Sequence, residues 1–217
     1  MIAVFGGIKG GSGKTTLSTN ICVERSYVGS KVLLVDADEQ MSSSMWSEHR
    51  ENLGIETKWT TVLLQGHSVK SQVCKMKSDY DEIIIDVGGR DTAYQRAALM
   101  VADVFVIPFQ PRSLDIWTLG KMSSLIDEAL SINENLVVFG VINRGDPFGQ
   151  DNEQAKQAIK DIGNIFCLET VVHNRKVFCN AASEGKGVLE MVPRHQKAIE
   201  EIESLSGEIY DIKKVSK

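Results

Sequence analysis

The residues best suited to chemistry lie near the N-terminus, in the stretch GIKGGSGKTT at positions 7–16. Glycines allow backbone N–H groups to approach a phosphate closely and allow the chain to turn with positive φ. Lys14 would reach the β- and γ-phosphates of a nucleoside triphosphate, and the Thr15 hydroxyl would ligate Mg²⁺. The stretch therefore predicts a phosphate-binding loop, whereas the simpler alternative is a flexible glycine turn.

A phosphate loop of this kind needs a strand before it and a helix after it. Residues 2–5 form a short apolar run suited to a buried strand. Apolar residues then recur at helical spacing from Leu17 to Val28, before Gly29. A helix that begins at Gly13-Lys14-Thr15 would direct free N–H groups and its positive dipole end at the phosphates.

One position departs from the general loop pattern G-x-x-x-x-G-K-[ST], because Ile8 stands where the pattern has glycine. The segment KGGSGKTT at 9–16 instead resembles the deviant Walker A motif, KGGxGKT[ST], of the ParA/MinD family of P-loop ATPases. This resemblance implies that the chain binds ATP and Mg²⁺. The nucleotide-binding residues that it implies are Lys9, Gly10, Gly11, Ser12, Gly13, Lys14, Thr15 and Thr16.

Lys9 matches the signature lysine of that family. In the family this lysine crosses a dimer interface to the partner's nucleotide, so the resemblance implies a homodimer that forms with ATP. Since only the dimer makes that contact, the nucleotide would shift a monomer–dimer equilibrium. The alternative is that Lys9 is a solvated surface charge.

Two aspartates follow an apolar run in the segment VDADEQ at 35–40. Alone, this pattern is typical of a strand end followed by a polar turn. The ParA/MinD family has a DxDxQ-like motif here, often with proline where this chain has Glu39. The resemblance implies that Asp36 lies near Mg²⁺ through a water and that Asp38 orients or activates the attacking water. The expected catalytic residues are therefore Lys9, Lys14 and Asp38.

A second apolar run, EIIID at 82–86, also ends in a carboxylate. Beside the phosphate loop, Asp86 resembles the Walker B aspartate, which makes Thr15, Asp36 and Asp86 the expected metal residues. The next residues, VGGRD at 87–91, resemble the switch II loop that senses the γ-phosphate. For the side chains after the glycines we expect only a helix start, with Asp91 or Thr92 as the N-cap.

Two further segments resemble the same family. Residues 108–111, PFQP, with Leu114 and Asp115, are similar to its PxxPsxlD segment. Asn143, followed by Arg144, is similar to its adenine-side asparagine, and an amide can both donate to and accept from adenine. On its own, Asn143 would be an ordinary turn residue at a strand end.

The path of the chain alternates short apolar runs with helical patterns. Strands this apolar on both faces indicate a parallel sheet covered by helices, and the alternation predicts a doubly wound α/β P-loop NTPase fold of three layers. We expect one domain over 1–217, with the motifs on the rim beyond the carboxyl ends of the strands. Further strands are expected at 31–36, 82–86, 103–108, 136–142 and 166–172, and helices near 41–51, 92–101, 114–130, 151–162 and 195–213.

Composition, cysteine spacing and the lack of long apolar runs argue against several other classes of protein. The 217 residues are 42% hydrophobic and 24% charged, as is ordinary for a globular protein, and the net charge is −5. The four cysteines are far apart with no C-x-x-C pair, which argues against a disulfide frame, a zinc site or an iron–sulfur site. No apolar run approaches bilayer length and no signal peptide precedes the first strand, so we expect a cytoplasmic protein.

Within the family, the resemblance is nearest to the short plasmid-type ParA partition proteins, and it includes the segment MSSSMW at 41–46. The early first strand predicts no N-terminal helix-turn-helix domain. The resemblance implies slow ATP hydrolysis stimulated by a ParB-like centromere-binding partner, nucleoid association and non-specific DNA binding by the ATP dimer. The candidate DNA residues are Lys156, Lys160, Arg175, Lys176, Arg194 and Lys197.

Two alternatives remain open. A MinD-like positioning ATPase would end in a basic amphipathic membrane helix. Here the C-terminal apolar stripe is flanked by glutamates that anionic lipid would repel, so we expect the stripe to pack on the core and no membrane contact; it consists of Ile199, Ile202, Leu205, Ile209 and Ile212. The second alternative is a metabolic P-loop enzyme, such as an ATP-dependent ligase, which would share the same loops.

Overall fold

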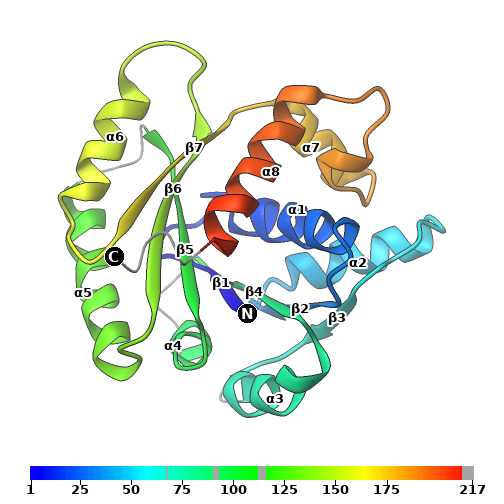
Figure 1. Cartoon of the computed structure of the whole chain (residues 1–217), viewed down its shortest axis with the longest axis horizontal. Coiled ribbons are helices and arrows are strands. Elements are labelled where there is room, and N and C mark those ends of the chain that lie inside the picture. The colour runs from blue at the N-terminus through cyan, green and yellow to red at the C-terminus, as the bar shows by residue number, and fades with distance from the viewer. Residues whose placement is uncertain (67, 90–92, 112–115, 212–217) are drawn as a thin grey trace.

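The computed structural model of the chain describes residues 1–66, 68–89, 93–111 and 116–211. Seven strands form one sheet in the order β3-β2-β4-β1-β5-β6-β7, and every neighbouring pair is parallel (Figure 1). This arrangement confirms the expected doubly wound parallel sheet. The strands are β1 (Ile2–Phe5), β2 (Val32–Ala37), β3 (Thr60–Leu63), β4 (Glu82–Val87), β5 (Val104–Phe109), β6 (Val137–Gly145) and β7 (Phe166–His173).

Helices cover both faces of the sheet. The buried side chains of α1, α2, α7 and α8 belong to one apolar core, and those of α3, α4, α5 and α6 belong to the other (Figure 1). The helices are α1 (Lys14–Tyr27), α2 (Ser42–Asn52), α3 (Ser68–Met76), α4 (Ala93–Leu99), α5 (Ile116–Ile132), α6 (Asp151–Lys160), α7 (Lys176–Ser183) and α8 (Gln196–Tyr210), with short 3₁₀ turns η1 (Lys77–Asp79) and η3 (Val188–Glu190).

The central strands are buried on both sides, which explains their unbroken apolar runs. In β1, Ile2 and Val4 enter one core while Ala3 and Phe5 enter the other. Successive side chains of a strand point to opposite faces, so a strand between two helical layers needs apolar residues at every position. After β1, the chain forms β2 and β3 at one edge of the sheet and returns to place β4 between β2 and β1. It then adds β5, β6 and β7 in order toward the other edge.

The sequence patterns do not predict β3, α3 or α7. The strand β3 has four residues at the sheet edge, and none of them is fully buried. The helices α3 and α7 have nine and eight residues. Elements this short repeat an apolar position only once or twice, so their periodicity is weak. The expected helix 151–162 ends at Lys160, while residues 92, 114, 115, 212 and 213 of other expected helices lie outside the described residues.

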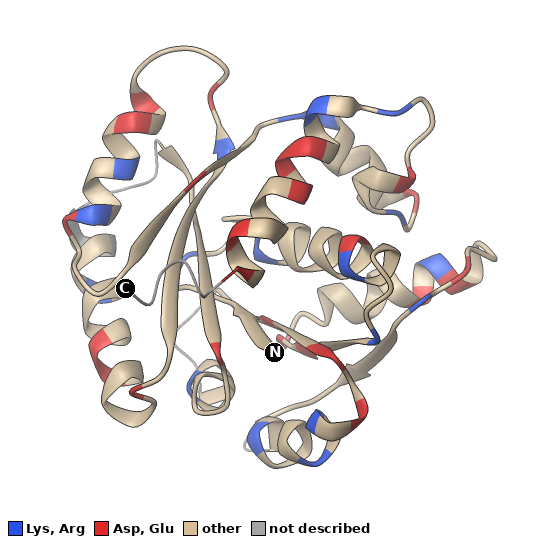
Figure 2. Ribbon diagram, viewed as in Figure 1, with Lys and Arg blue, Asp and Glu red and all other residues tan. Residues whose placement is uncertain are grey.

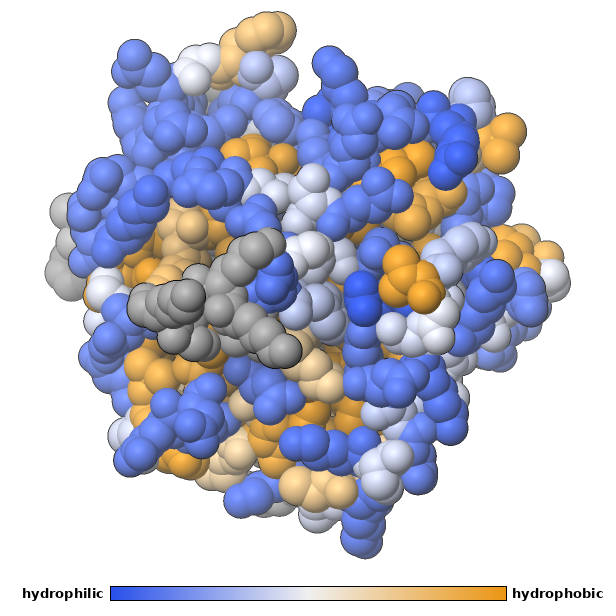
Figure 3. Space-filling model, viewed as in Figure 1, coloured by the Kyte–Doolittle hydropathy of each residue, from blue (hydrophilic) through white to orange (hydrophobic). Residues whose placement is uncertain are grey.

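The C-terminal helix α8 packs on the core as expected. Its stripe residues Ile199, Ile202, Leu205 and Ile209 are at most 2% exposed, and Ile212 lies outside the described residues. Figure 2 shows acidic residues along the same helix. In the part of the chain that the structure describes, no helix combines the length and apolarity that a membrane crossing requires. The face seen in Figure 3 is mostly hydrophilic, with apolar side chains in smaller patches.

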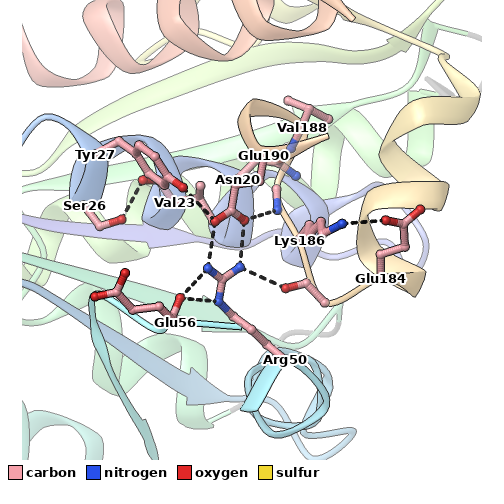
Figure 4. Close-up of polar contacts among 12 residues, drawn as sticks. Asn20, Val23, Ser26, Tyr27, Arg50, Glu56, Glu184, Lys186, Val188 and Glu190 are labelled. Atoms are coloured by element: carbon pink, nitrogen blue, oxygen red, sulfur yellow. Dashed lines mark hydrogen bonds and ion pairs between the residues drawn. The ribbon is translucent and has the colours of Figure 1, made fainter. Parts of the chain in front are cut away.

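A buried arginine fixes α2 to the C-terminal part of the chain (Figure 4). Arg50 is 2% exposed, and its two Nη atoms each donate to a carboxylate oxygen of Glu190 at 2.7 Å. It also donates to the carbonyl oxygens of Gly185 and Glu56, both at 3.0 Å, and its guanidinium lies 4.8 Å from the centre of the Trp59 ring. Burial would raise the pKa of Glu190, but the hydrogen bonds from Arg50 and Gly187 outweigh it and lower that pKa.

We expect Glu190→Ala to lower the free energy of unfolding by about 3–5 kcal/mol, because it leaves the Arg50 charge buried without its counter-charge. Denaturant unfolding followed by circular dichroism measures the change. The matched control is Glu184→Ala, which removes the partly exposed ion pair with Lys186 in the same region. Since exposed pairs contribute about 1 kcal/mol or less, equal losses for the two variants would contradict this account of the network.

Candidate nucleotide-binding site

The loop between β1 and α1 is a tight turn that depends on glycine. Gly11 and Gly13 have φ angles of 73° and 94°, a region that other residues rarely adopt. A β-carbon on Gly13 would lie only 2.0 Å from Nδ2 of Asn143, so no side chain fits there. Leu17 N donates to Gly13 O at 2.9 Å and opens α1. The free N–H groups at the start of α1 therefore border the loop, as a phosphate cradle requires.

A cleft of about 880 Å³ opens over this loop. Its volume lies within the roughly 300–1,000 Å³ of typical small-molecule sites. Three further loops complete it, after β2, after β4 and at the end of β6, all at the carboxyl edge of the sheet. The expected motifs thus converge on one rim. The lining includes Lys9, Gly10, Gly11, Gly13, Lys14, Thr15, Thr16, Asp38, Glu39, Gln40, Gly88, Gly89, Tyr94 and Arg144, and Ser12 is buried beneath.

Lys14 is held inside the loop with its ammonium group among the carboxylates of the site. Its side chain lines the cleft, yet the residue is only 6% exposed, and Nζ donates to Lys9 O at 3.1 Å. Burial lowers the pKa of Lys14, while the charges of Asp86 and Asp38 oppose that change. A positive charge thus lies where a triphosphate would bring its negative oxygens.

Asp86 is a fully buried acid whose charged form its surroundings disfavour. It is 0% exposed, and neither carboxylate oxygen has a well-aligned hydrogen-bond partner among the described residues. Burial raises the pKa of Asp86 to about 7; the nearby Thr15 hydroxyl and the Lys14 charge oppose this rise, and Asp36 and Asp38 add to it. The Thr15 hydroxyl and the Lys14 charge do not offset the cost of burying the charge, so a bound cation would stabilise the carboxylate.

The donor set around Asp86 fits Mg²⁺. A hard divalent cation prefers oxygen ligands, and the Thr15 hydroxyl and the Asp86 carboxylate present such atoms beside the cleft. Protein Mg²⁺ sites commonly use one or two side chains together with phosphate oxygens and waters. The site therefore has what a Mg²⁺–nucleotide complex would need from the protein.

The two aspartates after β2 have different surroundings. Asp36 is 0% exposed and uses both oxygens on the backbone, accepting from Asp38 N at 3.0 Å and from Ser44 N at 2.7 Å. It pairs in register with Asp86 on the adjacent strand, but its observed contacts hold the loop and the first turn of α2. Asp38 instead lines the cleft. Water-mediated metal contact by Asp36 stays a prediction, and so does the role of Asp38.

The loop after β4 lies directly on the phosphate loop. A β-carbon on Gly89 would be 2.9 Å from both the Gly10 backbone and Lys14 Nζ, and one on Gly88 would be 3.0 Å from Asp38 Oδ1. Only glycine allows this approach without displacing its neighbours. The remaining residues of the expected switch segment, 90 and 91, lie outside the described residues, as do both candidate N-caps, Asp91 and Thr92. Leu114 and Asp115 of the other family segment also lie outside them.

The sequence patterns do not predict the contacts of three supporting residues of the site. Gln95 on α4 is 0% exposed, and its Oε1 accepts from Gly7 N at 2.7 Å. Gln110, in the PFQP segment, donates from Nε2 to Gly11 O at 2.7 Å. Arg144 lines the cleft from a left-handed backbone position, φ 55°, where β6 departs from regular pairing with β7. Irregularities of this kind redirect side chains near active sites.

Asn143 lies beneath the phosphate loop. It is 3% exposed, and its Nδ2 donates to Ser12 O at 2.7 Å. The neighbouring Arg144, and not Asn143, lines the cleft. The observed contact therefore supports the loop, and the expected contact with adenine stays a prediction.

Comparison with known proteins identifies the family. Residues 3–189 match the family described as the CobQ/CobB/MinD/ParA nucleotide binding domain. The chain belongs to this family. Its curated relatives include the maintenance of carboxysome distribution protein A of Halothiobacillus neapolitanus, 29% identical over 204 residues that cover 93% of each chain.

Solved structures of ParA/MinD-type proteins share the fold. A putative plasmid partition protein from Borrelia burgdorferi, bound to AMPPNP, superposes with a TM-score of 0.71 at 20% identity and covers 98% of each chain. The septum site-determining protein MinD of Pyrococcus horikoshii, complexed with Mg-ADP, has a TM-score of 0.74 at 20% identity, covering 99% of this chain and 97% of its own. The expected ParA/MinD resemblance is confirmed.

The basic residues expected to contact DNA in this ParA/MinD-family chain fall into two groups. Lys156 is 8% exposed, and its ammonium donates to the carbonyl and the carboxylate of Glu169 at 2.9 and 3.1 Å. Arg175 donates to Glu201 at 2.5 Å. These ion pairs remove both from the set that we propose for DNA. Exposed basic residues remain at Lys160, Lys176, Arg194 and Lys197. Lys160 lies on α6, which packs on the opposite face of the sheet from α7 and α8.

We expect Asp86→Asn to stabilise the nucleotide-free protein above neutral pH. A pKa raised from 3.8 to about 7 means that the stability contributed by the protonated group is present below pH 3.8 and is lost as pH rises through 7. The amide carries no charge, so the advantage of the variant should grow between pH 4 and pH 7.5 to on the order of 1–4 kcal/mol. Denaturant unfolding across that pH range measures it.

The same variant should lose the increase in melting temperature that Mg²⁺ and ATP together give the wild-type protein, because its amide binds Mg²⁺ poorly. A pH-independent stability difference, or unchanged stabilisation by Mg-ATP, would show that Asp86 does not have this role.

We expect Asn143→Ala to weaken ATP and GTP binding equally, by about tenfold, since the lost hydrogen bond supports the phosphate loop. Isothermal titration calorimetry of both nucleotides measures the effect, with the melting temperature as the control for folding. A loss confined to ATP would instead indicate that Asn143 reads the adenine.

Proposed function

We propose that this chain is a ParA-type partition ATPase that couples Mg-ATP binding to dimerisation and to non-specific DNA binding, and that hydrolysis resets it. A ParB-like centromere-binding partner would stimulate hydrolysis and so link the cycle to the movement of a plasmid, chromosome or other cargo over the nucleoid. The observation that carries the proposal is the buried Asp86 carboxylate beside Lys14 and Thr15 in a KGGSGKTT loop.

In this proposal each residue of the cleft has one task. The glycine turn and the start of α1 bind the phosphates, and Lys14 neutralises their charge. Thr15 and Asp86 hold Mg²⁺, which supplies the charge neutralisation that phosphoryl transfer needs. Asp38, on the cleft wall, orients the water that attacks the γ-phosphate. Asp36 fixes the backbone on which Asp38 lies.

Lys9 is the residue on which the proposed dimer rests. The residue is exposed at the mouth of the cleft, whereas Lys14 is buried within the loop. A second lysine, exposed at the mouth of the site, suits a contact with the nucleotide of a partner copy. Likeness to partition and positioning proteins supports the proposed function. Exposed cations for phosphate contacts with DNA are present at Lys176, Arg194 and Lys197.

The test is light scattering of the protein with Mg-ATP or Mg-ADP, with and without non-specific duplex DNA. We expect a dimer only with ATP, and DNA retention that falls steeply with salt. A protein that is monomeric with both nucleotides and ignores DNA would overturn the proposal and favour a metabolic P-loop enzyme.

Lys9→Ala should abolish the ATP-dependent dimer and lower partner-stimulated hydrolysis at least tenfold while ATP binding survives within about threefold, because the remaining loop still holds the phosphates. The matched control is Lys70→Ala, which removes an exposed lysine from α3. Unchanged turnover in Lys9→Ala would exclude a contact with the partner's nucleotide.

A further inference from the structure

Two exposed methionines lie at the mouth of the nucleotide cleft. Met41 is 38% exposed and Met45 is 60% exposed. Met45 N donates to Met41 O at 2.9 Å, so their side chains emerge from one side of the first turn of α2. Met41 lies between Gln40 and Ser42, both of which line the cleft. An apolar pair therefore borders the place where the nucleotide would bind.

The packing of α2 keeps both methionine side chains exposed. The opposite side of α2 is buried through Ser43, Trp46, Ser47 and Arg50. Asp36 anchors its first turn through Ser44 N, and the Arg50–Glu190 ion pair anchors its last turn. Because both ends are fixed, α2 cannot rotate to bury the methionines. Met41 also adopts a left-handed backbone conformation, φ 50°, which is unfavourable for an unbranched apolar residue and therefore needs support from its surroundings.

The charges around the mouth suit a second copy of the same chain. Lys9 and Arg144 are exposed on its rim, and so is Glu39. Asp38 contributes a further negative charge inside. In a two-fold interface each patch meets its own counterpart, so a surface that carries both signs and an apolar pair is self-complementary.

We propose that Met41 and Met45 form the apolar contact between two copies of this chain whose nucleotide clefts face each other. This inference rests on the proposed ATP-dependent dimer and adds its contact residues. The backbone couples the contact to the site: Gln40 N donates to Asp38 Oδ1 at 3.1 Å, and Met41 N donates to Asp38 O at 3.0 Å. A nucleotide that orders Asp38 thereby also orders Met41. Thioether side chains adapt their shape readily at such interfaces.

Methionine oxidation of the wild-type protein tests the proposal without any substitution. Hydrogen peroxide is applied at several protein concentrations, with Mg²⁺ and a non-hydrolysable ATP analogue or with Mg-ADP, and peptides are analysed by mass spectrometry. The internal control is Met100 on the opposite helical layer, which is 38% exposed, as Met41 is. We expect the analogue to slow oxidation of Met41 and Met45 at least fivefold, increasingly with protein concentration, and to change Met100 less than twofold.

A second test uses Met45→Glu, with Leu53→Glu as a control at the far end of α2, where Leu53 is 53% exposed. We expect Met45→Glu to weaken the ATP-dependent dimer at least tenfold and Leu53→Glu to leave it unchanged. The ATP affinity of the monomer, measured at protein concentrations too low for dimerisation, should be the same in both. A wild-type dimer that forms without protecting Met41 and Met45, protection that is independent of protein concentration, or equal effects of the two variants would overturn this contact and leave the proposed function standing. A wild-type protein that stays monomeric with ATP would overturn both.

Discussion

A fully buried carboxylate, Asp86, which the nearby Lys14 charge stabilises only in part, is the feature on which the site depends. Asp86 has no contact with solvent, and the residues around it provide one ammonium, one hydroxyl and two further carboxylates. Such a group is costly in the empty protein and favourable once a cation is present. The same burial that raises the pKa of Asp86 therefore makes binding of a metal and its nucleotide favourable. The parallel sheet creates this situation, because it directs the ends of β2 and β4 to one buried edge.

The glycines around the carboxylate set the distances between the loops. Gly13 lies against Asn143 and Gly89 lies against Gly10, each closer than a β-carbon permits. The end of β6 and the loop after β4 therefore contact the phosphate loop closely, through the Asn143 side chain and through backbone. Gln95 and Gln110 complete this arrangement by bonding to Gly7 N and Gly11 O. The site is therefore closely packed where phosphates would bind. Its exposed mouth carries Lys9, Glu39 and Arg144.

Helix α2 connects the cleft to the C-terminal part of the chain. Asp36 fixes its first turn, and Arg50 fixes its last turn to Glu190 and Gly185 (Figure 4). Asn20 adds a second connection, because it donates to Thr16 O at the start of α1 and accepts from Val188 N. The segment that leads into α8 is thus held by both helices that begin at the nucleotide cleft. Any displacement of these helices on nucleotide binding would reach that segment directly.

The sequence by itself determined the local chemistry: a glycine-rich loop between strand and helix, apolar runs ending in Asp36 and Asp86, and an alternation that requires a parallel sheet. These features depend on residues close together in the chain. Only the tertiary structure decided which groups have partners. It gave both oxygens of Asp36 to the backbone, set Asn143 under the phosphate loop, and paired Lys156 and Arg175 with glutamates. Those outcomes depend on contacts between residues far apart in sequence, whose distances no local pattern contains.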